Sequence, residues 1–225
     1  MNDDFIVPAW QGSPRVHAVF TTRSVAVPSE RLRQRLPAEP VWLSQVHGKD
    51  VVNVDGREAA RPQADAAVTS MPGVVIAVRT ADCLPVLFAD RAANVIAVAH
   101  AGWRGLAAGV LEAAVDAMNV DARDVDSWIG PAIGPQAFEV GRDVHDAYCV
   151  ADAACARYFA PLREDKWLAD LAGLARHRLA AIGVTSVAGG DCCTYTDAAR
   201  FFSYRRERGA GRMALAAWIS TGENA

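Results

Sequence analysis

Two histidines and one cysteine stand out because each lies at the end of an apolar stretch. His47 follows VWLSQV, Cys83 follows VVIAVRTAD, and His100 ends VIAVAH. Imidazole nitrogens and a thiolate sulfur are ligands that zinc prefers, and catalytic zinc sites combine three protein ligands with one open position. Sheet-based proteins place ligands at strand ends. We therefore predict a metal site made by these three residues, and packing in the core is the alternative for each of them.

Asp82 directly precedes Cys83 in the sequence. Its carboxylate could accept a hydrogen bond behind the metal ligands, or it could transfer a proton during a reaction. The alternative is a solvated turn residue. We assign Asp82 to the catalytic set, next to Cys83.

The segment after His100, AGWRG, predicts an anion site. Gly102 and Gly105 permit close approach of the backbone, and the helix that follows begins with free N–H groups. Arg104 could add a bidentate contact to phosphate, so it joins the catalytic set. A tight turn from strand to helix is the alternative explanation for the two glycines.

Cys83 and His100 also permit a different chemistry. A thiolate activated by an imidazole is a nucleophile for acyl transfer. Such a Cys83-dependent amide hydrolase would form a thioester intermediate and would need no metal, whereas the metal site predicts loss of activity with a chelator.

Composition places the chain among ordinary globular proteins. It has 225 residues, 52% hydrophobic and 22% charged, with a net charge of −3. This balance excludes a disordered chain and argues against nucleic acid or an anionic membrane as partner. The five cysteines are odd in number, the N-terminus MNDDFIVPAW lacks the pattern of a signal peptide, and no apolar run approaches the ~20 residues that span a bilayer. We expect a cytoplasmic protein with reduced thiols.

Short strands and helices alternate along the chain. Periodicity predicts strands over residues 16–22, 41–46, 51–54, 66–69, 74–79, 84–88, 95–99, 127–130 and 184–187. Apolar residues at helical spacing predict helices over residues 29–36, 106–118, 143–158 and 168–182, and residues 212–219 form a strand or a helix. We predict one mixed α/β domain over residues 1–225.

Seven short motifs occur in order: FTTR (20–23), QVHG (45–48), TADCLP (80–85), HAGWRG (100–105), IGPAIGP (129–135), CTYT (193–196) and FFSYRRE (201–207). Together they resemble the laccase-domain family of bacterial proteins, also called the multicopper polyphenol oxidase or purine nucleoside phosphorylase family. The resemblance extends over nearly the whole chain.

This resemblance implies a fold and an activity. The fold is a single α/β domain of mixed β-sheets flanked by helices, similar to cysteine hydrolases. The implied zinc ligands map to His47, Cys83 and His100. The implied activity is phosphorolysis of adenosine, inosine and methylthioadenosine, together with deamination of adenosine.

We place the substrate contacts within the motifs. The expected substrate-binding residues are Arg23, Gln45, Gly102, Gly105 and Phe202. Phe202 could stack on a flat base, although an aromatic core cluster is an equal alternative for it. Purine nucleosides and phosphate are the expected partners.

The older family name implies a copper polyphenol oxidase, which the histidine count disfavours. A blue site with a trinuclear cluster needs about ten histidines, whereas this chain has five. Copper is therefore a less favoured cofactor than zinc. The chain also departs from the family after FTTR, because residues 24–40 are shorter than the glycine-rich segment of other members. If that segment lines the substrate pocket, the pocket here is more open or its substrate range is altered.

Overall fold

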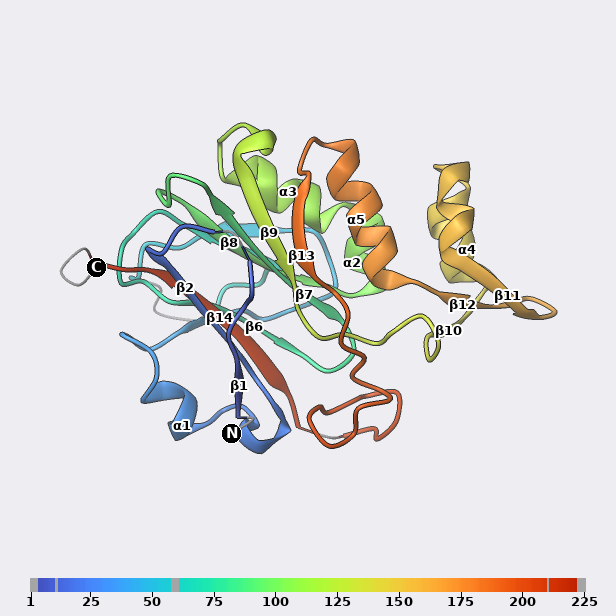
Figure 1. Ribbon diagram of the computed structural model, residues 1–225, viewed down its shortest axis with the longest axis horizontal. Coiled ribbons are helices and arrows are strands. Elements are labelled where there is room, and N and C mark those ends of the chain that lie inside the picture. Colours follow the sequence, from blue (N-terminus) through green and yellow to red (C-terminus); the bar gives the residue numbers. More distant parts are fainter. Residues whose placement is uncertain (1–3, 11, 58–60, 210, 222–225) are drawn as a thin grey trace.

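The computed structural model describes residues 4–10, 12–57, 61–209 and 211–221. Its centre is a pair of stacked β-sheets (Figure 1). The first sheet has five strands in the order β1 (Phe5–Ile6), β2 (Val16–Thr21), β14 (Met213–Ile219), β6 (Ile76–Thr80) and β3 (Val41–Trp42). The second has six strands in the order β13 (Ser186–Gly189), β9 (Val125–Ile129), β7 (Leu84–Asp90), β8 (Ile96–Ala101), β5 (Ala66–Thr69) and β4 (Val51–Asn53).

Apolar side chains between the two sheets form one core. Phe20 and Leu215 from the five-stranded sheet pack in the same cluster as Leu87 and Val98 from the six-stranded sheet. Strands β7 and β8 are buried along their whole length, because helices cover the face of the six-stranded sheet that points away from this core. Such strands lack polar–apolar alternation and appear in the sequence as continuous apolar runs.

Helices lie on the outer faces of both sheets (Figure 1). The six-stranded sheet is covered by α2 (Trp103–Ala108), α3 (Val110–Ala117) and α5 (Leu171–Ala181). The short α1 (Glu30–Arg33) places Leu32 against the outer face of the five-stranded sheet. A small third sheet, with the order β10 (Glu139–Gly141), β12 (Lys166–Ala169) and β11 (Phe159–Arg163), carries α4 (Arg142–Cys149) at one side of the molecule. The predicted mixed α/β architecture is confirmed.

Several predicted elements differ from the observed ones. The helix predicted over residues 106–118 begins earlier, at Trp103, and is divided at Gly109, whose φ of 98° is left-handed and ends α2. The helix predicted over residues 143–158 ends at Cys149, and Asp152 then caps a separate 3-10 turn over Ala153–Tyr158 by accepting the N–H of Ala154.

Other predictions extended an element too far. The helix predicted over residues 168–182 starts only at Leu171, because Lys166–Ala169 pairs as β12 and Asp170 caps the helix through the N–H of Gly173. The strand predicted over residues 41–46 ends at Trp42. Beyond it, Ser44 forms only an isolated bridge to Gln63, and the amide of Val46 binds the buried carboxylate of Asp65. The predicted helix over residues 29–36 is reduced to α1, and Ser29 makes no side-chain cap. Residues 213–219 are a strand, β14.

Within the described residues, no helix combines the length and the apolar character that crossing a bilayer requires.

Candidate metal centre and its cavity

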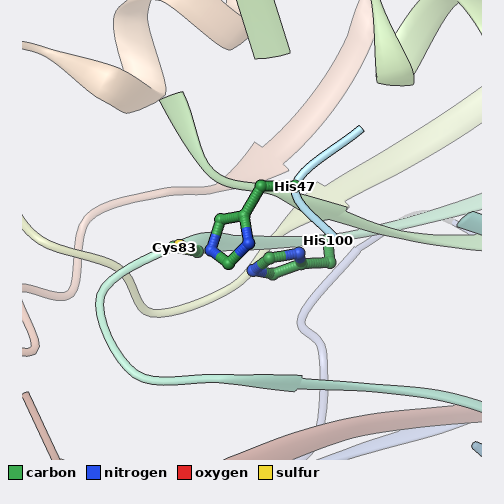
Figure 2. Close-up of side chains that lie close together, drawn as sticks. All are labelled: His47, Cys83 and His100. Atoms are coloured by element: carbon green, nitrogen blue, oxygen red, sulfur yellow. The ribbon is translucent and has the colours of Figure 1, made fainter. Parts of the chain in front are cut away.

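The structure brings the three predicted ligands together (Figure 2). The ligand atoms of His47, Cys83 and His100 all lie within 4.8 Å of one another. The two imidazole rings meet edge to face, with centroids 4.8 Å apart and planes at 81°. His100 is buried, Cys83 is partly buried, and His47 is exposed. The group is therefore able to hold a metal ion and is accessible from the His47 side.

Strand pairing explains how residues far apart in sequence meet. Strands β7 and β8 are antiparallel, with Leu84 opposite Ala101 and Pro85 opposite His100. This register places Cys83, the residue before β7, beside the end of β8. His47 arrives separately, on the loop between β3 and β4.

Asp65 joins this loop to the sheet. Its buried carboxylate lies 2.8 Å from Nδ1 of His100 and accepts backbone N–H groups from Val46, His47 and Gly48 at 3.1, 3.0 and 2.7 Å. With Nδ1 bound to Asp65, Nε2 is the nitrogen of His100 that remains for a metal. Asp65 directly precedes the strand predicted over residues 66–69, and no role was predicted for it. The available signal was an acidic residue that directly precedes a fully buried strand.

His47 has an unusual backbone conformation. Its φ of 61° is in the left-handed region, which costs a non-glycine residue free energy of order 1 kcal/mol and is common at functional sites. The hydrogen bonds from residues 46–48 to the Asp65 carboxylate hold this conformation. The loop is thus shaped so that the His47 ring turns toward Cys83 and His100 (Figure 2).

The protonation states of the group are coupled. Burial raises the pKa of Cys83, but hydrogen bonding and positive charge from His100 and His47 outweigh it and bring that pKa down to about 6. Burial lowers the pKa of His100, but Asp65 and Cys83 raise it to about 9. Burial also raises the pKa of Asp65, while His100 and the backbone amides lower it, and the net direction is downward. The metal-free protein therefore favours a thiolate at Cys83, the form that binds a metal.

The glycines of the predicted anion site lie against the metal centre. A Cβ on Gly102 would be 2.9 Å from Sγ of Cys83, and a Cβ on Gly105 would be 2.7 Å from the carbonyl oxygen of Gly48. Close packing of α2 on the His47 loop therefore requires both glycines. Arg104 is exposed and lies over the Trp103 ring, 4.2 Å from its centroid. The turn alternative thus accounts for the glycines, and a phosphate contact at these residues stays a prediction.

Asp82 points to a different part of the molecule. Its carboxylate accepts hydrogen bonds from Oγ1 of Thr194 at 2.6 Å, from Oγ of Ser203 at 3.0 Å and from the N–H of Arg205 at 2.7 Å. The carboxylate that supports the histidine is therefore that of Asp65. Asp82 instead ties the segment before β14 to the start of β7, and its role in proton transfer stays a prediction.

Arg23 and Phe202 contact each other. The Arg23 guanidinium lies over the Phe202 ring, 4.8 Å from its centroid, donates to the carbonyl of Ala198 and pairs with Glu207 at 3.5 Å. Neither residue is part of the cavity wall beside the metal centre. Their substrate contacts stay predictions, and the aromatic side chain that does line the cavity is Tyr204.

A cavity of about 670 Å³ opens beside the three ligands, within the size range of small-molecule sites. Its wall consists of Gln45, His47, Arg79, Thr80, Ala81, Cys83, His100, Tyr204 and Arg212. No residue of the shortened segment 24–40 belongs to this wall. A larger hollow of about 880 Å³ lies between α3, α5 and the start of β4, and the three ligands do not line it.

Gln45 borders the cavity but uses its amide on the backbone. Its Nε2 donates to the carbonyl of Arg79 at 2.8 Å, and its Oε1 accepts the N–H of Arg79 at 2.9 Å. The predicted substrate contact of Gln45 is untested, and its observed contacts position Arg79. The arginines of this wall were missed, because Arg79 ends an apolar strand and no motif marks it.

A second group of potential ligands lies outside the cavity. Asp152, Cys155 and His177 have ligand atoms within 4.8 Å of one another, and Nε2 of His177 is 2.6 Å from Oδ2 of Asp152.

Known proteins similar to this chain include bacterial enzymes. A protein named purine nucleoside phosphorylase YfiH, from Escherichia coli K12, is 53% identical over 184 residues, which are 82% of this chain and 75% of that protein. A protein named purine nucleoside phosphorylase PA4543, from Pseudomonas aeruginosa, is 45% identical, with coverage of 96% and 98%.

Solved structures match in fold as well. Protein NMB0706 of Neisseria meningitidis superposes with a TM-score of 0.93 at 40% identity and covers 96% of this chain and 99% of its own. YlmD of Geobacillus stearothermophilus gives a TM-score of 0.78 at 26% identity, with coverage of 97% and 99%. The family model described as multi-copper polyphenol oxidoreductase laccase matches residues 19–220. The chain therefore belongs to the multi-copper polyphenol oxidoreductase laccase family.

Proposed function

We propose that the protein is a zinc-dependent purine nucleoside phosphorylase that also deaminates adenosine. The observation that carries the proposal is the cluster of His47, Cys83 and His100 at the wall of a cavity large enough for a nucleoside. The names of relatives with 53% and 45% identity support the choice of purine nucleosides and phosphate as substrates.

The residues present fit zinc. Two imidazole nitrogens and one sulfur form a catalytic type of donor set, and the exposed His47 side leaves room for a fourth ligand. Asp65 supplies the carboxylate that commonly orients a metal-bound histidine. When bound, zinc supplies a Lewis acid and lowers the pKa of water.

The remaining tasks belong to the side chains of the cavity wall. Tyr204 is 49% exposed and presents an aromatic surface on which a purine can stack. Phosphorolysis also needs phosphate in the same cavity, so that an oxygen of phosphate reaches C1′ of the ribose while the bond from C1′ to the base breaks. For deamination, phosphate is not needed.

Product analysis tests the proposal. Zinc-loaded protein incubated with adenosine and phosphate should release adenine and ribose 1-phosphate, and inosine and methylthioadenosine should be cleaved in the same way. Adenosine without phosphate should give inosine and ammonia. Absence of turnover for all three nucleosides with zinc-loaded protein would contradict the phosphorylase, and absence of inosine would contradict the deaminase alone.

One observation favours a second candidate, an amide hydrolase with Cys83 as nucleophile. The pKa of Cys83, lowered to about 6 beside His100, is typical of an activated thiol. This candidate requires activity in metal-free protein and covalent trapping of Cys83 by an electrophilic amide analogue. Activity that a chelator abolishes and zinc restores would exclude it.

A further inference from the structure

The cavity wall at the end of β6 carries positive charge. Arg79 and Thr80 are the last two residues of β6, and Arg212 directly precedes β14. Because Arg79 pairs with Ala214 across the two antiparallel strands, Arg212 is its diagonal neighbour on the same side of the sheet. All three residues line the same cavity as the metal ligands.

Two polar atoms of this wall are buried without a partner. Nε of Arg79 and Oγ1 of Thr80 have no hydrogen bond within the described part of the chain, and Thr80 is only 1% exposed. Burial of a polar group without a partner destabilises the fold, and such groups are rare unless a ligand or water completes them. Nε of Arg79 is a hydrogen-bond donor, and the hydroxyl of Thr80 can also donate. A ligand with acceptor oxygens would therefore satisfy both groups.

The positive charges around Arg79 also favour an anion at this wall. Arg61 and Arg212 are close enough that their positive charge, after the larger effect of burial, lowers the pKa of Arg79. Among residues 4–10, 12–57, 61–209 and 211–221, no carboxylate forms an ion pair with Arg79. Arg212 lies over the Tyr204 ring, 5.7 Å from its centroid, and donates to the carbonyl of Gly211. An anion would offset the repulsion between these guanidinium groups.

The position of Arg79 is held firmly. Gln45 binds both the N–H and the carbonyl of Arg79, and Gln45 lies two residues before His47. Gln45 therefore connects the strand that carries Arg79 to the loop that carries His47.

We propose that Arg79, Arg212 and Thr80 bind inorganic phosphate beside the metal centre, with Gln45 as a positioning residue for Arg79. The choice of phosphate among oxyanions rests on the phosphorylase proposed above. Guanidinium groups bind tetrahedral oxyanions through paired N–H donors. This site differs from the turn at Gly102–Gly105, where Arg104 is exposed, stacked on Trp103 and outside the cavity wall.

Phosphate held here has a defined part in the reaction. One phosphate oxygen forms the bond to C1′ as the bond between C1′ and the base nitrogen breaks. The electron pair of that bond remains on the nitrogen, and the proton of hydrogen phosphate ends on the base. The products are ribose 1-phosphate and the free base, so atoms and charge balance.

Kinetics and binding together test the site. In zinc-loaded Arg79→Gln and Arg212→Gln variants, we expect the KM for phosphate to rise at least about tenfold, a clearly larger factor than any fall in kcat/KM for adenosine deamination, which uses no phosphate. Arg79→Lys keeps the positive charge but loses the paired N–H donors of the guanidinium, so its KM for phosphate should lie between those of the wild type and Arg79→Gln. Arg123→Gln is the matched control, because Arg123 is exposed, pairs with Asp121 and does not line the cavity.

Calorimetric titration of inorganic phosphate separates this inference from the proposed activity. Saturable binding to the wild-type protein that is lost in the two Gln variants supports the site even if no nucleoside is cleaved. Phosphorolysis with an unchanged KM for phosphate in both variants would overturn the site and leave the activity standing. A raised KM in Arg104→Gln alone would move the site to the turn before α2. If adenosine 5′-monophosphate binds through Arg79 while inorganic phosphate does not, the site recognises a phosphate ester and the inference is wrong.

The variants need a check that they are folded. Zinc content and melting temperature should equal those of the wild type within error. If Arg79→Gln fails to fold, Arg212→Gln decides the question, because Arg212 precedes β14 rather than lying within a strand.

Discussion

The carboxylate of Asp65 lies 2.8 Å from Nδ1 of His100, and both side chains are almost completely buried. The same carboxylate accepts the N–H groups of residues 46–48. One acidic side chain therefore orients His100 on β8 and shapes the loop that carries His47. Removal of its charge should affect two of the three ligands at once.

Replacement Asp65→Asn tests this role. The amide keeps the size of the side chain but accepts hydrogen bonds less strongly and donates from its nitrogen. Substitution of such a supporting partner commonly weakens metal binding by about 10–100-fold, and we expect a loss in that range. Zinc titration against a chromophoric chelator measures it. Asp152→Asn, which alters a carboxylate paired with His177 outside the cavity, is the control and should keep the wild-type affinity. Equal affinities in both variants would contradict the role of Asp65.

Metal content should depend on the three ligands individually. We expect His47→Ala, Cys83→Ala and His100→Ala each to purify with clearly reduced zinc by elemental analysis, because a site with two protein ligands binds weakly. His177→Ala, from the second Asp, Cys and His group, should retain full zinc. Full occupancy in all three cavity variants would show that the metal is held elsewhere. The same analysis distinguishes zinc from copper.

The thiol of Cys83 should titrate at low pH once the metal is removed. Since the folded pKa, about 6, is below the ordinary value for cysteine, the thiolate persists as pH falls and is lost only below about pH 6. In chelator-treated protein, the alkylation rate at Cys83 should therefore be nearly constant above pH 7 and fall below pH 6. Mass spectrometry of peptides alkylated by iodoacetamide follows each cysteine separately.

Cys192 provides the internal control for that titration. Burial and the charge of Asp191 raise the pKa of its thiol, so its alkylation should increase only in alkaline solution. A Cys83 profile that coincides with that of Cys192 would show that His100 and His47 do not stabilise the thiolate.

Gly105→Ala should disturb the packing of α2 on the metal loop. The added Cβ would be 2.7 Å from the backbone carbonyl of Gly48, which cannot rotate away as a side chain would. Overpacking of this kind costs about 1–3 kcal/mol of unfolding free energy, and the shift should also lower zinc affinity through His47. Urea unfolding and zinc titration measure the two effects. In the matched Gly48→Ala variant the nearest contact is an ordinary 3.6 Å, so both quantities should change little. An unperturbed Gly105→Ala variant would contradict the packing role.

The cluster of His47, Cys83 and His100 was predictable because residue type and strand ends are local signals, and its role as a metal site stays a prediction. His47, Cys83 and His100 are each marked by an apolar run in the sequence, and the motif order indicated the family. Their partner Asp65 was not predictable in this way. Its contacts extend to residues 17 to 35 positions away, and nothing in the surrounding RPQAD shows which amides its carboxylate will face.

The same limit applies to the rest of the fold. The break at Gly109 interrupts an apolar pattern that continues in phase on both sides, so periodicity alone predicts one helix. Strands β11 and β12 lie mostly at the surface and lack an apolar run, and their pairing in the small third sheet depends on contacts between distant residues. Nothing in the sequence around Arg79 indicates a site, because Arg212 comes to lie beside it only through the pairing of β14 with β6.

Two of the three candidate ligands, Cys83 and His100, are attached to paired strands, and the third, His47, is on a loop whose amides are bound to Asp65. The sheet thus positions Cys83 and His100, and Asp65 positions the loop that carries His47. We expect that an ion bound by His47, Cys83 and His100 would link the loop to the sheet and would suppress the local opening through which amide hydrogens exchange with solvent. The amides of Val46, His47 and Gly48 should consequently exchange more slowly with deuterium in the zinc-loaded protein, so that isotope exchange at three consecutive residues reports the assembly of the centre without any substrate.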